Sequence, residues 1–192
     1  MDVQYLPINW QQYQSLALSL AEKLLNKEAP FDEIVAIARG GLTLGHLLSD
    51  YLNLPICSIT IQSYTDIQKQ GELRITAGLK AQIGGKRILL VDDIADTGKT
   101  LKRAIGYLKR FRPAKITTVT MFYKPHSTFK PDYFVEQTGR WVIFPHEQTE
   151  TILLLTKAMK KQKKSDADIR RLLHSLNFTD HQIVFVQKHY KL

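Results

Sequence analysis

The chain of 192 residues has one cysteine, Cys57, so no disulfide can form within it. It also has no run of about 18 apolar residues, the length that a membrane-spanning helix needs. The first residues lack the basic stretch followed by an apolar run that marks a secretory signal. We therefore expect a buried, reduced thiol and a cytoplasmic protein that does not bind a membrane.

Acidic residues are few relative to basic ones, since 27 Lys and Arg against 18 Asp and Glu give a net charge of +9. The excess is concentrated in residues 157–192, which hold nine Lys and Arg and three Asp. Such a segment can bind nucleic acid or an acidic partner. It can also be the solvated face of surface helices, and we favour this explanation because no nucleic-acid recognition signature accompanies it. Nucleic acid is therefore not expected as a partner.

Apolar periodicity divides the chain into alternating strands and helices. The predicted elements are a helix from about Asn9 to Asn26, strands over 34–38, 55–61, 88–91 and 115–122, and helices over 42–52 and 101–108. This alternation is typical of an α/β protein whose parallel-sheet core is flanked by helices. Ligands of such sheets bind beyond the carboxyl ends of the strands. Four polar residues fall at these ends: Arg39, Asp92, Asp93 and Lys124.

The most informative stretch is Ile88–Leu101, where four apolar residues are followed by Asp92 and Asp93. A turn containing Gly98 then opens a helix, and backbone N–H groups at such a helix start bind phosphate. Carboxylates beside a phosphate site suit a ligand with hydroxyl groups, a divalent cation or a developing positive charge. A ribose 5-phosphate with a leaving group at C1 offers all of these.

Two other interpretations of this stretch are weaker. A nucleoside-triphosphate loop needs a glycine five residues before Gly98, and position 93 is Asp. Capping of the helix by acidic side chains needs one carboxylate, whereas this stretch supplies Asp92, Asp93 and Asp96.

The segment Val91–Thr100 resembles the signature with which type I phosphoribosyltransferases bind 5-phosphoribosyl-1-pyrophosphate (PRPP). With later motifs, the chain is most similar to the xanthine-guanine and hypoxanthine-guanine enzymes over about residues 31–147. The resemblance implies a phosphoribosyltransferase domain over residues 1–150 with a small hood at about 126–147. Residues 151–192 would form a helical, basic extension that the resemblance does not cover.

The resemblance also implies a role for each residue of the signature. Asp92 and Asp93 would hold the ribose hydroxyls, and Asp93 with Glu147 would lie near a Mg²⁺ cofactor. Asp96 would be the catalytic residue that manages the proton at the purine imidazole nitrogen. The 5-phosphate would be bound by Thr97, Gly98, Lys99 and Thr100.

Arg39 and Gly40 match the family's pyrophosphate loop. An Arg fork can bond two oxygens, and a glycine lets the backbone approach a ligand closely. Taken alone, the pair also fits an ordinary strand-to-helix turn. The peptide before this Arg is often cis in the resembling enzymes, and here it is Ala38–Arg39.

The long polar stretch from Ser63 and Tyr64 to Arg74 is typical of a lid or a disordered loop. Ser63 and Tyr64 resemble the start of the family's flexible loop, which closes over PRPP and excludes water. Relatives carry an Arg where this chain has Gly71, so Lys69 or Arg74 would supply that charge.

Three residues after the predicted sheet match the family's base-binding set. Lys124 would donate to the exocyclic oxygen of a purine, Trp141 would stack on the ring, and the backbone of Val142 would read the base edge. Alternatively, Lys124 is a surface lysine and Trp141 covers a small sheet. The order of the motifs along the chain favours a base-binding site.

We expect a purine-salvage enzyme that joins PRPP to guanine, hypoxanthine or xanthine, releases pyrophosphate and forms a homo-oligomer. The alternative is a non-catalytic PRPP-binding regulator of transcription that uses its basic tail. An intact lid and base-binding set favour the enzyme.

Overall fold

The computed structural model describes residues 3–26, 30–66 and 69–190, with the side chains of all but residues 63–72. Its contacts divide the chain into two compact units. The sheet unit is Gln14–Gly139, and the helical unit combines Met1–Tyr13 with Arg140–Leu192. Each unit has a hydrophobic core of its own.

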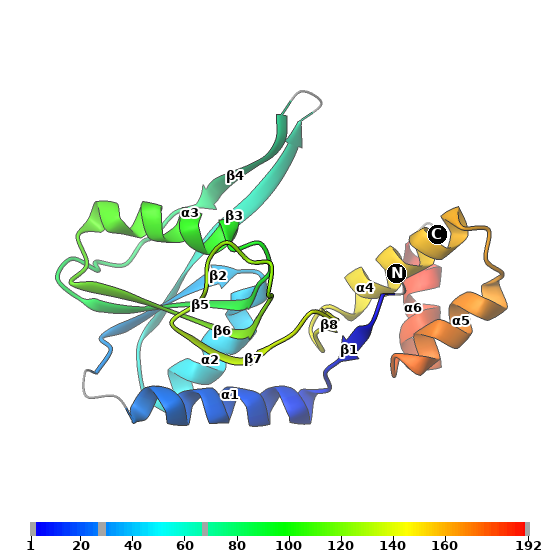
Figure 1. Ribbon diagram of the computed structural model, residues 1–192, viewed down its shortest axis with the longest axis horizontal. Helices are drawn as coiled ribbons and strands as arrows, with labels where there is room; N and C mark the ends of the chain where they lie inside the picture. Colours follow the sequence, from blue (N-terminus) through cyan, green and yellow to red (C-terminus); the bar gives the residue numbers. More distant parts are fainter. Residues whose placement is uncertain (1–2, 27–29, 67–68, 191–192) are drawn as a thin grey trace. The chain divides into compact units, whose positions relative to one another are not determined.

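The sheet unit is built on a six-stranded sheet in the order β4-β3-β2-β5-β6-β7 (Figure 1). Neighbouring strands pair in parallel, except that β4 is antiparallel to β3. The strands are β2 (Glu33–Ala38), β3 (Ile56–Asp66), β4 (Lys69–Ala77), β5 (Arg87–Ala95), β6 (Lys115–Tyr123) and β7 (Tyr133–Gln137). This confirms the α/β class with a mostly parallel sheet.

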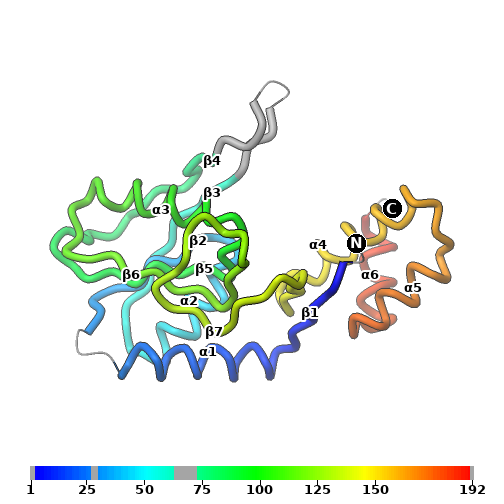
Figure 2. The backbone as a smooth tube through the Cα atoms, viewed as in Figure 1, coloured from blue at the N-terminus to red at the C-terminus, as the bar shows by residue number. Residues whose placement is uncertain are grey.

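Helices cover both faces of this sheet. Figures 1 and 2 show α3 (Lys99–Leu108), which continues into η1 (Lys109–Phe111), on one face. The other face carries α2 (Gly40–Leu52) and the part of α1 (Trp10–Leu25) that belongs to this unit. The helix α3 buries Leu101, Ala104 and Leu108 against the sheet, which is the stripe expected at helical spacing.

The hairpin of β3 and β4 differs from the sequence prediction. The stretch from Ser63 to Arg74 was expected to be a loop, whereas most of its described backbone continues these two strands. Antiparallel pairing satisfies the backbone N–H and C=O groups whatever the side chains are, so a polar sequence can still form such a ribbon. Ile61, which pairs with Ile75, belongs to the apolar side of the same ribbon.

The helical unit contains a small parallel pair, β1 (Tyr5–Pro7) with β8 (Trp141–Ile143), followed by three helices. These are α4 (Gln148–Lys161), α5 (Asp166–Ser175) and α6 (Asp180–His189). Their shared core includes Ile152, Leu155, Leu173 and Ile183. The predicted helical character of the carboxyl-terminal region is thus confirmed.

The predicted domain limit at residue 150 and the hood at 126–147 stay predictions. Within the hood range, β7 belongs to the large sheet and β8 to the small one. Among the residues that the structure describes, no helix combines the length and the apolar character needed to cross a membrane.

Candidate functional site

The carboxyl end of β5 places two acidic side chains at the edge of the sheet. Asp92 and Asp93 are only 7% and 8% exposed, although each carries a carboxylate. The Asp92 Oδ1 atom accepts the N–H of Asp93 at 3.1 Å, and the Asp93 Oδ1 atom accepts the N–H of Ile94 at 2.6 Å. Burying a carboxylate is costly unless other groups compensate its charge. Two buried carboxylates that are adjacent in the chain are therefore typical of a ligand site.

The turn after β5 leads directly into α3. Gly98 precedes the helix with φ of 76°, a left-handed conformation that glycine adopts without strain. A side chain at this position would also meet Ser127 Oγ at 2.7 Å and the backbone N of Phe129 at 2.8 Å. The first N–H groups of α3 lack partners within the helix, which is the arrangement that binds phosphate. Lys99 and Thr100 form the start of that helix.

The start of α2 approaches the same acidic pair. Arg39 precedes α2, is exposed and follows a cis peptide bond from Ala38, as the sequence resemblance predicted. A Cβ atom added to Gly40 would collide with the Asp93 carboxylate, so only glycine fits between them. The predicted pyrophosphate loop and the predicted ribose-binding acids are therefore in contact.

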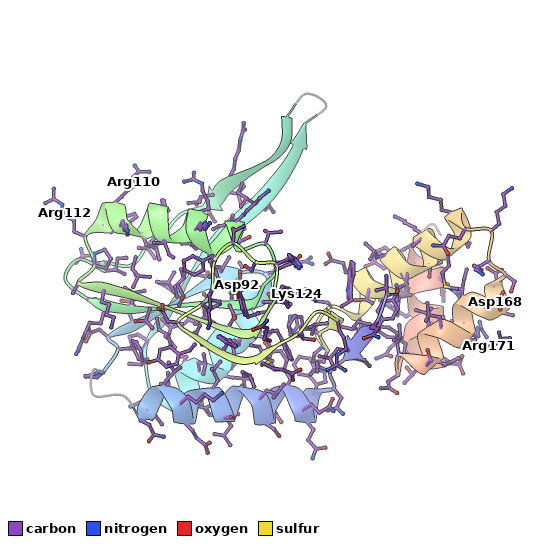
Figure 3. The ribbon with its side chains drawn as sticks, viewed as in Figure 1. Asp92, Arg110, Arg112, Lys124, Asp168 and Arg171 are labelled. Atoms are coloured by element: carbon purple, nitrogen blue, oxygen red, sulfur yellow. The ribbon has the colours of Figure 1, made fainter. Side chains whose placement is uncertain are left out.

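Lys124 follows β6 and lies beside the turn after β5. Its backbone N–H donates to the Ala95 carbonyl at 3.0 Å, and its residue is only 7% exposed. Burial lowers the pKa of the Lys124 ammonium, and the nearby Asp96 carboxylate partly opposes this shift. Figure 3 labels Lys124, which directly follows β6, and Asp92, which lies on the neighbouring strand β5. The structure thus brings Lys124 to the predicted catalytic acid.

His126 lies beside the predicted catalytic acid, and the sequence interpretation did not single it out. Its Nε2 atom lies 2.9 Å from Oδ1 of Asp96, with both side chains more than half exposed. The next residues tie the same two segments together, because the Thr128 N–H and hydroxyl both donate to the Thr97 carbonyl, at 3.1 and 2.9 Å. The available signal was its position: His126 comes two residues after Lys124, in a Pro-containing turn at a strand end.

Three other predicted site residues, Trp141, Val142 and Glu147, belong to the helical unit. Trp141 is 48% exposed and pairs with Tyr5 in the helical unit, where Val142 is buried and Glu147 precedes α4. Their roles in binding the base and the metal stay predictions. The side chains of Ser63 and Tyr64 are outside the described residues, so the lid also stays a prediction.

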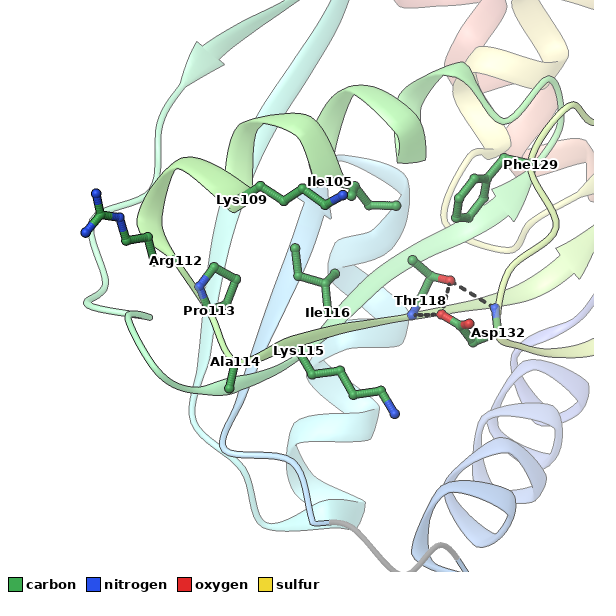
Figure 4. A pocket seen from close by; sticks show the side chains of 10 residues that line it. All are labelled: Ile105, Lys109, Arg112, Pro113, Ala114, Lys115, Ile116, Thr118, Phe129 and Asp132. Carbon is green, nitrogen blue, oxygen red and sulfur yellow. Dashed lines mark hydrogen bonds between the residues drawn. The ribbon is translucent and has the colours of Figure 1, made fainter.

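A separate cavity of about 390 Å³ lies between α3 and β6 (Figure 4). Its lining includes Ile105, Ile116 and Phe129, and none of the residues predicted to bind substrate. Asp132 at its edge accepts the N–H and the hydroxyl of Thr118, both at 2.7 Å. This cavity reaches the amino end of β6, at Lys115, and is distinct from the strand-end cluster.

A parallel sheet with acids, a glycine turn and a lysine at its carboxyl edge places the chain among α/β proteins that bind their ligands there. The model of the phosphoribosyl transferase domain matches residues 9–148, and the chain therefore belongs to this family of enzymes. The predicted family resemblance and the predicted enzyme class are both confirmed.

Solved structures of purine phosphoribosyltransferases are similar to this chain. That from Pyrococcus horikoshii Ot3 is 34% identical, with 73% of this chain and 93% of that chain covered and a TM-score of 0.69. The Helicobacter pylori xanthine-guanine-hypoxanthine phosphoribosyltransferase is 26% identical over 78% of this chain and 97% of its own, with a TM-score of 0.68. The hypoxanthine phosphoribosyltransferase of Trypanosoma cruzi, solved with its product IMP, shares the fold at 21% identity, a TM-score of 0.57 and coverage of 67% and 76%.

Proposed function

We propose that this protein transfers the 5-phosphoribosyl group from PRPP to a 6-oxopurine base, guanine, hypoxanthine or xanthine, and releases pyrophosphate. The proposal includes a role in purine salvage, a Mg²⁺ cofactor, a homo-oligomeric state and a cytoplasmic location. The similar enzymes from Pyrococcus horikoshii Ot3 and Helicobacter pylori support purines as the substrate class.

The main support is the meeting of three predicted substrate-binding segments at one edge of the sheet. Asp92 and Asp93 lie near the carboxyl end of β5, Gly40 contacts Asp93, and Gly98 opens α3 a few residues after the acids. A ligand with a phosphate, vicinal hydroxyls and a pyrophosphate needs a helix start for the phosphate, carboxylates for the hydroxyls and a glycine loop for the pyrophosphate. PRPP carries a phosphate, vicinal hydroxyls and a pyrophosphate.

In the proposed reaction, a purine imidazole nitrogen forms the new bond to C1 of the ribose as pyrophosphate leaves with the electron pair of its C–O bond. Positive charge develops on the ribosyl group, and the carboxylates of Asp92 and Asp93 stabilise it while they bind the hydroxyls. Asp96 accepts the proton that the purine gives up. Lys124 donates to the oxygen at C6, which excludes adenine because its amino group is also a donor.

The residues present fit a magnesium ion. The buried carboxylate of Asp93 supplies hard oxygen ligands of the kind Mg²⁺ prefers, and buried negative charge beside Asp92 favours a cation. When bound, Mg²⁺ would neutralise pyrophosphate as it leaves. The proposal takes three further roles from the sequence resemblance. Glu147 is a further ligand of the ion, and Trp141 and Val142 bind the base.

Asp96→Asn tests the proposed chemistry, because the amide keeps the shape of the side chain but cannot accept a proton. We expect calorimetry to give a PRPP affinity close to that of the wild type, and kcat to fall by about 10²–10⁴-fold. Asp166→Asn, at an exposed position on α5, is the matched control and should leave kcat unchanged. An unaltered kcat in Asp96→Asn would remove this assignment, and firm PRPP binding by a wild type without turnover would favour the regulator.

A further inference from the structure

We infer that His126 is a positioning residue for the proton transfer, and that it acts by orienting the Asp96 carboxylate toward the purine. The inference rests on the proposed function and assigns a residue to it that no sequence motif indicated. Its basis is the 2.9 Å approach of the His126 Nε2 atom to Oδ1 of Asp96.

A tight turn directs His126 at Asp96. The Ser127 N–H donates to the Lys124 carbonyl at 3.0 Å and closes a four-residue turn whose second residue is Pro125. Proline is favoured at that position because its φ is already set to the value the turn needs. The turn starts where the Lys124 N–H donates to Ala95, the residue just before Asp96. The lysine proposed to read the base and the histidine are thus presented by one hydrogen-bonded turn.

The chemistry of the pair determines which atom carries the hydrogen. An ionised carboxylate only accepts hydrogen bonds, so the Nε2 atom of His126 must be the donor. This bond occupies Oδ1 of Asp96 and fixes the side-chain rotamer, which leaves Oδ2 as the atom that receives the purine proton. A base that is itself held by a third group is the usual arrangement of an activated acid–base pair.

The exposure of the pair argues against a mainly structural role. The Asp96 side chain is 59% exposed and that of His126 is 64% exposed, and hydrogen bonds or ion pairs between such exposed side chains add little to stability. An exposed aspartate without such a partner would sample several rotamers. Orientation is therefore what the histidine contributes, and its loss should reduce the rate without unfolding the protein.

The test is a double-mutant cycle with a rescue variant, measured as kcat and KM for the base and for PRPP. His126→Ala should lower kcat by about ten- to a hundredfold, as small misplacements of reacting groups do, with the KM for PRPP unchanged. His126→Gln should restore most of the rate, because its amide nitrogen lies at the same distance along the side chain. In an Asp96→Asn background, His126→Ala should have no further effect. His46→Ala, an exposed histidine on α2, is the matched control.

A loss of equal size in the Asp96→Asn background, or a glutamine variant as slow as the alanine variant, would overturn the inference. A nitrogen NMR spectrum of the histidine rings gives a readout that does not depend on turnover. It should show His126 protonated at Nε2 in the wild type and lose that preference in Asp96→Asn. Wild type without turnover would defeat the proposed function, whereas turnover with an unchanged spectrum would defeat the pairing of His126 with Asp96.

Discussion

At the scale of single residues, the charge on Lys124 should decide which base is accepted. Lys124→Ala should raise the KM for the base by about 10- to 100-fold, since a hydrogen bond to a charged group contributes about 1.5–3 kcal/mol. The KM for PRPP should stay nearly constant. Steady-state kinetics with each substrate varied in turn measures both values.

The same residue predicts a pH dependence. Burial lowers the pKa of Lys124, so its ammonium loses the proton at a lower pH than an exposed lysine does. The KM for the base should therefore rise as pH increases through that lowered pKa. The guanidinium of Lys124→Arg stays charged over this pH range, although its shape differs from that of an ammonium. The KM for the base should therefore change less with pH in Lys124→Arg. Identical profiles for the wild type and Lys124→Arg would contradict this role, because ionisation of the base itself affects both proteins equally.

Sequence can single out candidate residues where chemistry and local sequence coincide, and the binding roles of these candidates stay predictions. Asp92, Asp93 and Gly98 were recognisable because a buried strand, two acids and a glycine turn follow one another along the chain. His126 was missed because its partner, Asp96, is 30 residues away, and only the pairing of β5 with β6 brings the two together. A contact between the ends of two neighbouring strands produces no periodic pattern in the sequence from which it could be predicted.

At the scale of elements, the amino ends of β2 and β5 are joined by an ion pair between Asp32 and Arg87. The Arg87 guanidinium donates to both carboxylate oxygens, at 2.9 and 2.6 Å, and its backbone N–H donates at 2.7 Å. These bonds hold the pKa of the Asp32 carboxyl well below its usual range. A carboxyl whose pKa is lowered by folding stabilises the folded state above its unfolded pKa, and this contribution decreases as pH falls toward the folded pKa.

Asp32→Asn should therefore lower the melting temperature at pH 7, and the difference from the wild type should narrow as pH falls below about 4. Calorimetry across this pH range measures it. Asp50→Asn, at an exposed position on α2, is the control and should change the melting temperature little. A difference between Asp32→Asn and the wild type that is absent at pH 7, or that grows in acid, would show that the ion pair does not stabilise the sheet.

The order of the elements was predictable, but one hairpin was not. Parallel strands buried on both faces are nearly continuous apolar runs, and β2 and β5 have this pattern. The distal part of the β3–β4 ribbon has few apolar residues, so nothing in its composition distinguished a strand from a loop.

Cys57 on β3 was expected to be buried, and it is half-buried in the structure. Desolvation, together with the nearby Glu33, raises the pKa of its thiol to about 12.

At the scale of the whole molecule, the basic carboxyl-terminal region has a structural explanation within the helical unit. The helices α5 and α6 bury apolar residues against α4, and Thr179 forms a capping box with Gln182 at the start of α6. The lysines of α4 that contribute to its charge, such as Lys157 and Lys160, are exposed on a helix. This arrangement fits a packed appendage and supports the solvated-face explanation.

Removing residues 162–192 should lower the melting temperature of the helical unit, because α4 would lose its partner surface. Leu173→Ala is a milder variant and should reduce the free energy of unfolding by about 2–5 kcal/mol, since the leucine is fully buried. Leu154→Ala, at a site 46% exposed, is the matched control. Thermal unfolding measures the melting temperature of the truncated protein, and chemical denaturation measures the free energies of unfolding of the two leucine variants. Tight, salt-sensitive binding of the intact protein to nucleic acid, lost on truncation, would instead favour the regulator.

The measurement that tests the proposed function most directly is turnover of the purified protein with PRPP, Mg²⁺ and a panel of bases. Guanine, hypoxanthine or xanthine should yield the nucleoside monophosphate and an equal amount of pyrophosphate. The rate with adenine should be lower by about 100-fold or more, because the buried Lys124 would face another donor. Preferred turnover of adenine or orotate, or PRPP binding with no turnover of any base, would contradict the proposed 6-oxopurine phosphoribosyltransferase.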